Sequence, residues 1–127
     1  MIRTVLERTR DYLDTFNYLD GYTVRYFKWQ DSDLTVDSPF VVFMIGAAGS
    51  NSDVYVQRHQ IRVLVVGTSD DILSAEATTA DIAKKFRESD STITGVIKFN
   101  MIGNPIGPRF LDNDRPIFEI NVTAFTE

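Results

Sequence analysis

The sequence predicts a single α+β domain: a two-layer sandwich whose mainly antiparallel sheet, of about five strands, carries two helices on one face. Three observations lead to this prediction. Two stretches repeat apolar residues with a helical period, several others are rich in β-branched and aromatic residues, and the elements follow the order helix, strands, helix, strands. Two amphipathic helices need an apolar surface to cover, and one sheet supplies it. The length, residues 1–127, is that of one domain.

The first half of the chain predicts one helix and two strands. A helical face is formed by Ile2, Val5, Leu6, Thr9, Leu13 and Phe16. Gly21 follows as the expected terminator of this helix. Residues 23–29 are aromatic and β-branched, which is typical of a strand. The continuous apolar run at residues 40–45 predicts a strand that is covered on both faces, and the small polar residues 46–53 predict a loop.

The second half predicts a long strand, a second helix and two further strands. Residues 54–67 form the long strand, and Thr68 or Ser69 then offers an acceptor for the first free amides of the helix. The apolar stripe of this helix is Ile72, Ala75, Thr79, Ile82 and Phe86. Residues 92–102 and 116–125 alternate with a period of two, as strands with one buried face do.

Composition excludes several classes of function. The chain has no cysteine, so disulfides, thiolate metal sites and cysteine nucleophiles are absent, and a reducing cytoplasm is the expected compartment. The formal charge is −5 and the basic residues are scattered, whereas a nucleic-acid surface needs clustered cations. The N-terminus is charged throughout and no long apolar run is present, so we expect neither a secretory signal nor a membrane span.

No pattern in the sequence indicates catalysis. His59 is the only histidine, and its place in the middle of a strand favours a hydrogen-bonded strand residue or a residue at a subunit contact over a catalytic base. Asp112 and Asp114 form a carboxylate pair, but Asp-Asn-Asp is a common turn composition and the turn is the preferred interpretation. We therefore expect no catalytic residue.

Two further motifs match a ligand site only in part. Residues 31–37 place oxygen ligands at alternate positions, as a calcium loop does. However, Val36 replaces the glycine and Val42 replaces the bidentate acid that such a loop requires. Residues 46–50 are rich in glycine but lack the lysine and hydroxyl of a phosphate-binding loop. We therefore expect no metal and no cofactor.

The segment 103–116 is the most unusual stretch, because it holds three of the four prolines. Pro105, Pro108 and Pro116 fix φ, so a loop of this composition loses little conformational entropy when it docks. Gly103 and Gly107 permit tight bends. We interpret the segment as a stiff loop between the last two strands that makes an assembly contact.

The candidate contact residues fall into two groups. Ile106, Phe110 and Leu111 are too apolar for a loop that faces only water. The charged side chains that would form the rim of such a contact are Arg109, Asp112, Asp114 and Arg115. The alternative is that Phe110 and Leu111 fold back on their own sheet.

The arrangement resembles the tail terminator (tail completion) proteins of long-tailed bacteriophages. The resemblance covers nearly the whole chain and is carried by three stretches: the N-terminal helix that leads into a sheet, "QIRVLVVGTSDDILSAEATTADIAKKF" at residues 60–86, and "GPRFLDNDRPIFEINVTAF" at residues 107–125. It implies a structural virion protein of the tail, assembled in the host cytoplasm, without enzymatic activity, cofactor or membrane contact. It further implies a homohexameric ring that caps the tail tube and joins it to the head connector.

The implied partners are other copies of the chain, the tail tube protein and a head-completion or connector protein. DNA would only pass through the lumen, and the acidic balance of the chain suits such a conduit. Two alternatives remain open. One is another head–tail joining, neck or tail protein. The other is a small-molecule-binding or catalytic α+β domain, which would show a pocket with convergent polar groups and perturbed pKa values.

Overall fold

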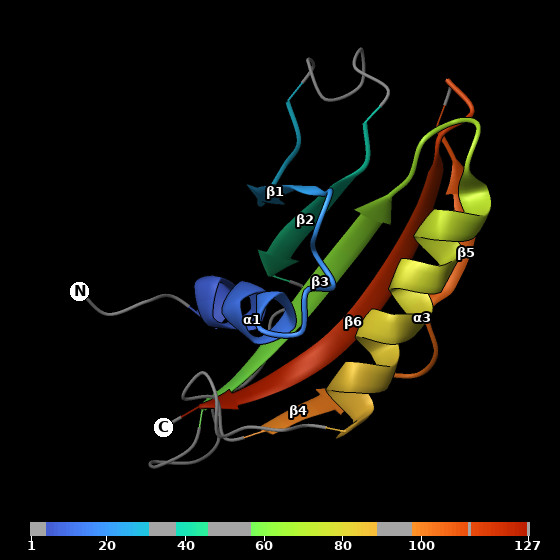
Figure 1. Ribbon diagram of the computed structural model, residues 1–127. Coiled ribbons are helices and arrows are strands. Elements are labelled where there is room, and N and C mark those ends of the chain that lie inside the picture. Colours follow the sequence, from blue (N-terminus) through green and yellow to red (C-terminus); the bar gives the residue numbers. More distant parts are fainter. Residues whose placement is uncertain (1–4, 31–37, 46–56, 89–97, 112, 127) are drawn as a thin grey trace.

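The computed structural model describes residues 5–30, 38–45, 57–88, 98–111 and 113–126 (Figure 1). The two helices in these ranges are α1 (Val5–Asp14) and α3 (Ile72–Glu88). The strands are β1 (Thr23–Tyr26), β2 (Phe40–Ile45), β3 (Gln57–Val66), β4 (Lys98–Met101), β5 (Ile106–Phe110) and β6 (Pro116–Thr126). Neither helix is long and apolar enough to cross a lipid bilayer.

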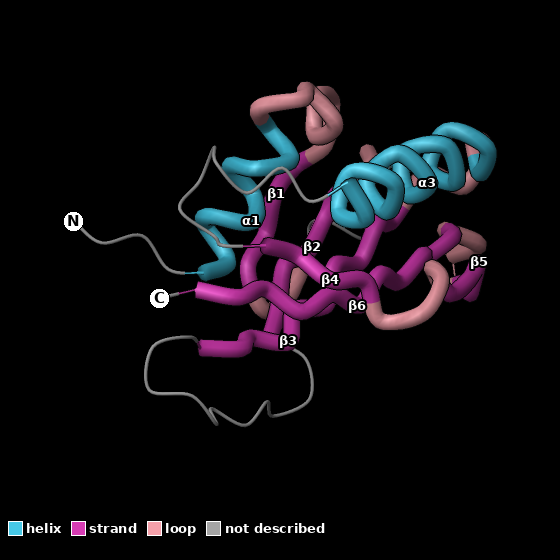
Figure 2. The backbone as a smooth tube through the Cα atoms, turned by 90° about the horizontal axis from the view of Figure 1, so that it is seen from below, coloured by secondary structure: helices cyan, strands magenta, loops and turns pink. Residues whose placement is uncertain are grey.

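The strands form one open sheet in the order β1-β2-β3-β6, and β4 and β5 both pair with the far side of β6. β1 and β2 are parallel, and the other pairs are antiparallel. Lys98 of β4 pairs with Phe125, whereas Ile106 of β5 pairs with Glu119, so the two short strands cover opposite halves of β6. Both helices lie on the same face of the sheet (Figure 2). The α+β prediction is confirmed, with six strands in the described residues where about five were expected.

The main core lies between the helices and the sheet, and aromatic side chains join the two helices there. The ring of Tyr12 on α1 lies 4.7 Å from that of Phe99 on β4, and the Phe86 ring of α3 lies 5.0 Å from Phe99, centroid to centroid. The Tyr12 hydroxyl also donates to the Lys85 carbonyl of α3 at 2.8 Å, so this fully buried phenol finds a partner. Tyr12 was not among the residues expected on the buried face of α1.

α1 ends earlier than predicted. The last helical residue is Asp14, and Asn17 takes the left-handed conformation with φ of 63°. The Asn17 amide donates to Asp14, and the Tyr18 amide donates to the Leu13 carbonyl. These two bonds form a Schellman motif, in which asparagine replaces the usual glycine. The prediction that Gly21 terminates the helix was therefore wrong, because Asn17 already supplies the left-handed residue.

α3 begins later than predicted, because its N-cap is Asp71 and not Thr68 or Ser69. The Asp71 carboxylate accepts from the Ser74 amide at 3.2 Å and from the Ser74 hydroxyl at 2.7 Å. Hydrogen bonds from the Ser74 hydroxyl and then its amide lower the pKa of Asp71, because they favour its charged form. The two carboxylate oxygens of Asp71 thus accept both the amide and the hydroxyl of Ser74.

A smaller apolar cluster lies on the other face of the sheet and consists of Phe40, Val42, Leu64, Val66 and Ile117. Arg115 is buried beside it, with 1% of its surface exposed. Its Nε donates to the Gly67 carbonyl at 2.9 Å, its Nη2 donates to the Ser38 carbonyl, and its guanidinium carbon lies 5.1 Å from the centre of the Phe40 ring. This one side chain therefore ties the segment before β2 and the end of β3 to the start of β6.

Replacing Arg115 should destabilise the fold. Arg115→Leu leaves the carbonyls of Ser38 and Gly67 without this donor, and an unpaired buried carbonyl costs about 1–3 kcal/mol. We expect the free energy of unfolding to fall by about 3 kcal/mol in urea titrations. The matched control is Arg109→Leu, whose surface ion pair is worth less than about 1 kcal/mol. Equal losses in the two variants would contradict the role assigned to Arg115.

Candidate functional site

The segment 103–116 is not a free loop, because Ile106–Phe110 within it form the edge strand β5. Ile106 pairs with Glu119 and Phe110 pairs with Pro116, with a shift of register between Ile106 and Arg109. Gly107 has φ of 131°, and a Cβ at this position would lie 2.7 Å from the Ile117 carbonyl oxygen, so glycine is required where β5 approaches β6. The interpretation of residues 106–110 as a loop was wrong. The glycine and the proline of this strand are typical of loops, which is why the sequence did not predict a strand here. Both residues are nevertheless tolerated at an irregular sheet edge.

The end of the segment is a tight turn that joins β5 to β6. The Leu111 amide donates to the Arg115 carbonyl, and the Asp114 amide donates to the Leu111 carbonyl, both at 2.9 Å. Asp114 is exposed and has φ of 64°, a conformation that aspartate tolerates better than most residues. The turn interpretation of Asp114 is confirmed. Asp112 lies outside the described residues.

The predicted contact residues separate into two groups in the structure. Ile106 and Phe110 are 50% and 55% exposed. Arg109 is also exposed, and its Nη2 lies 3.3 Å from Glu119 Oε1 on β6. In contrast, Leu111 is half-buried against the smaller apolar cluster and Arg115 is buried. The alternative that Phe110 and Leu111 fold back on the sheet therefore holds for Leu111 and not for Phe110.

In the described residues, most of the large exposed apolar side chains lie near the two edges of the sheet. The described residues of this kind are Phe27, Ile45, Leu73, Ile102, Ile106 and Phe110. Three of them, Ile102, Ile106 and Phe110, follow β4 or belong to β5, and we call them the β5 edge patch. Ile106 pairs with Glu119 and Phe110 pairs with Pro116, so these two side chains project from opposite faces of the same sheet edge. Phe27 and Ile45 lie at the ends of β1 and β2, at the other side of the sheet, and only Leu73 lies on a helix. The sequence did not reveal this grouping, because it depends on strand order.

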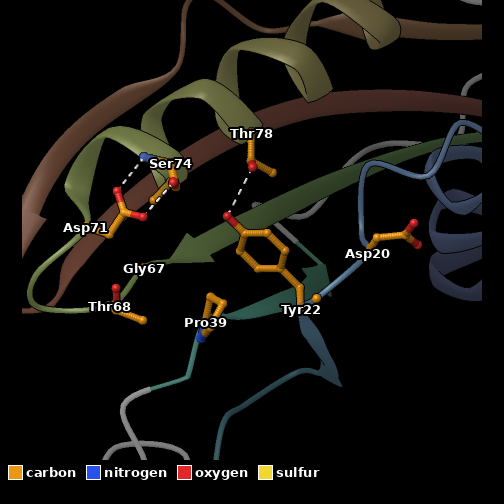
Figure 3. Close-up of a pocket in the computed structure, with 10 residues that line it drawn as sticks. Asp20, Tyr22, Pro39, Gly67, Thr68, Asp71, Ser74 and Thr78 are labelled. Atoms are coloured by element: carbon orange, nitrogen blue, oxygen red, sulfur yellow. Dashed lines mark hydrogen bonds between the residues drawn. The ribbon is translucent and has the colours of Figure 1, made fainter.

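A polar groove of about 310 Å³ lies beside the N-terminus of α3 (Figure 3). Its polar side chains bond to one another: Tyr22 donates its hydroxyl to Thr78 at 3.0 Å, and Asp71 accepts from Ser74. The first bond ties the segment before β1 to α3, and the second caps the helix. The described residues contain no group of three or more histidine, cysteine, aspartate or glutamate side chains that could hold a metal ion. The arrangement of these groups supports a structural role for them.

His59 lies on β3, paired with Ala124 of β6, and is half-buried. Burial, and next the positive charge of Arg8 on α1, lower the pKa of this histidine. Both effects disfavour the imidazolium form, so the side chain is neutral at pH 7. These surroundings agree with the interpretation of His59 as a strand residue.

A protein family described as phage tail termination protein matches residues 2–127 of the chain. No curated protein matches the sequence. Because the family match spans nearly the whole chain, the chain belongs to this family, which makes it a component of the phage tail. The match confirms the resemblance found from the element order and the three stretches described above.

The neutral state of His59 predicts how its replacement behaves. Below its unperturbed pKa of 6.5 the unfolded chain binds a proton that the folded protein resists, so His59 lowers stability as the pH falls through that value. We expect His59→Gln to reduce this acid sensitivity, to change the free energy of unfolding by less than about 1 kcal/mol at neutral pH, and to leave assembly intact. Thermal melts at several pH values test the prediction. Lost assembly in a folded His59→Gln protein would contradict it.

Proposed function

We propose that this member of the phage tail termination family assembles into a ring, hexameric as the family resemblance implies, that caps the polymerised tail tube. The ring would fix the length of the tube and offer a surface to the head connector. The match over residues 2–127 is the observation that carries this proposal. Assembly would take place in the host cytoplasm, and the protein would act without catalysis or a cofactor.

The exposed edge of the sheet supports assembly with other chains. In the described part of the chain, no strand pairs with the outer side of β5, and the apolar side chains of Ile106 and Phe110 are half exposed there. Sheet edges of this kind are normally covered or blunted by charge, because they pair readily with other chains. A ring covers such an edge through symmetry.

Within this proposal, Phe110 and Ile106 are the apolar centre of the assembly contact. Arg109 and Asp114 are exposed beside them and form its polar rim. Leu111 and Arg115 are not part of this contact. Leu111 packs against the smaller apolar cluster, and Arg115 bonds to Gly67 at the end of β3. DNA would only pass through the lumen of the ring, and the net charge of −5 per chain avoids retention of phosphate there.

The oligomeric state tests the proposal directly. We expect light scattering coupled to size-exclusion chromatography to show a ring of about six subunits, either for the protein alone or after it meets tail tubes. Negative-stain microscopy should place the ring at one end of the tube. A monomer that also fails to bind tail tubes would refute the proposed function.

A double substitution tests the contact residues. Arg109→Ala with Phe110→Ala removes exposed side chains, so the monomer should melt within a few degrees of wild type. Ring formation or tube binding should fail, because an aromatic anchor at a contact is worth about 2 kcal/mol or more. Leu73→Ala is the control, since Leu73 is 74% exposed on α3 and is not one of the proposed contact residues. If the melting temperature drops sharply and the remaining folded protein assembles normally, the edge packs within the subunit instead.

A further inference from the structure

A second apolar surface lies at the other edge of the sheet, where β1 is the last strand in the described part of the chain. Here the start of α1 and the ends of β1 and β2 enclose a groove of about 350 Å³. We call it the β1 groove, and its lining residues are Val5, Leu6, Glu7, Tyr26, Phe27 and Ile45. None of these lining residues is among the contact residues proposed at β5, so the apolar lining of the groove needs an explanation of its own.

The backbone at Phe27 is strained in a way that keeps its ring at the groove. Phe27 has φ of 70°, and the Lys28 amide donates to the Tyr26 carbonyl at 2.9 Å, which closes a γ-turn around Phe27. This turn is rare and costly for a bulky residue. The Phe27 amide bonds to the Phe43 carbonyl at 2.8 Å, which fixes the turn to β2, yet the ring remains 61% exposed. Strain of this kind concentrates at functional surfaces.

We propose that the β1 groove receives the β5 edge patch of a second copy of this chain. The inference rests on the proposed ring, since it names the surface that meets β5 in the neighbouring subunit. The two apolar surfaces consist of different residues, and the strands beside them, β1 and β5, lie at opposite edges of one sheet (Figure 1). A contact between two different surfaces is heterologous, and repeated copies of it generate a closed ring or a filament.

Charge supports this pairing. Glu7 is the only charged residue among the described residues that line the β1 groove. The segment 98–111, which contains β4 and β5, carries Lys98 and Arg109 and no carboxylate. Arg109 pairs with Glu119 of its own chain at 3.3 Å, but its side chain stays 64% exposed, so it can also approach Glu7 of a neighbouring copy at the rim of the contact. Opposite charges at a rim mainly select the partner and its orientation.

The proposed contact depends on side chains more than on backbone hydrogen bonds between β5 and a strand of the neighbouring copy. β5 shifts register between Ile106 and Arg109, and Pro108 has no amide hydrogen to offer. A regular extension of the sheet across subunits is therefore disfavoured at this edge. A groove that accepts projecting apolar side chains is the complementary surface that such an edge needs.

The absence of cysteine permits a direct test by cross-linking. Ile45→Cys and Phe110→Cys introduce thiols at exposed positions of the two surfaces, 45% and 55% exposed in the wild type. With a flexible bis-maleimide, the double variant should give a ladder of covalent oligomers. Each single variant alone should give no cross-link, and an equal mixture of the two should give dimers only. The control pair, Leu73→Cys with Phe110→Cys, should not form the ladder.

A second variant tests the groove without a risk to folding. Phe27→Gly removes the ring and relieves the backbone strain, since glycine adopts a positive φ without steric cost. We expect this variant to keep or raise the melting temperature and to assemble about tenfold more weakly, by concentration-dependent light scattering. The control is Leu73→Ser, because glycine at this position would destabilise the helix. This control should assemble as wild type.

The outcomes separate this inference from the proposed function. Rings that form without a cross-link between positions 45 and 110 would overturn the pairing and leave the proposed function intact. Cross-links in a single variant alone would also overturn it, because they would show that a surface meets itself. If the wild type assembles neither alone nor on tail tubes, both proposals fail.

Discussion

The structure depends on one strand, β6, which pairs with three others. Its side toward β3 is paired from Ile117 to Thr126, and its other side is divided between β4 and β5. The residues that alternate toward the helices, Phe118, Ile120, Val122 and Ala124, are all buried in the main core. The position of β6 is set at its start by Arg115, which bonds to the segment before β2 and to Gly67 at the end of β3. β6 therefore holds together the edge strand β5, the main core and the ends of the neighbouring strands that Arg115 contacts.

Among the described residues, no strand pairs with the outer side of β1 or of β5. β1 is held by β2 alone and β5 by β6 alone, and five of the six large exposed apolar side chains in the described residues lie beside these two strands. Monomeric proteins usually protect such edges with charge or cover them. The helices cannot do so here, because both pack on one face of the sheet, where they bury the main core. The exposed apolar side chains at the edges are therefore a property of the topology.

The sequence predicted the elements whose signal is local. The period of α3, the continuous apolar run of β2 and the alternation of β6 each placed an element within a few residues. β5 was missed because its glycine and its proline are typical of a loop, and its pairing with β6 depends on tertiary structure. Arg115 was expected at the surface, since charge patterning does not show that two backbone carbonyls will surround a guanidinium. The β1 groove was missed because Val5, Phe27 and Ile45 meet only after folding.

The irregularity of β5 explains why a proline-rich segment suits this edge. A regular, apolar edge strand would pair with any other exposed strand and would promote aggregation. In β5, Gly107 must approach the β6 backbone closely and Pro108 lacks an amide hydrogen, so the outer ladder is interrupted. Ile106 and Phe110 nevertheless remain exposed on either side of this interruption. An edge of this kind discourages indiscriminate backbone pairing and retains apolar side chains that only a complementary surface can bury. A sheet edge can therefore take part in ordered assembly without becoming a general site of aggregation.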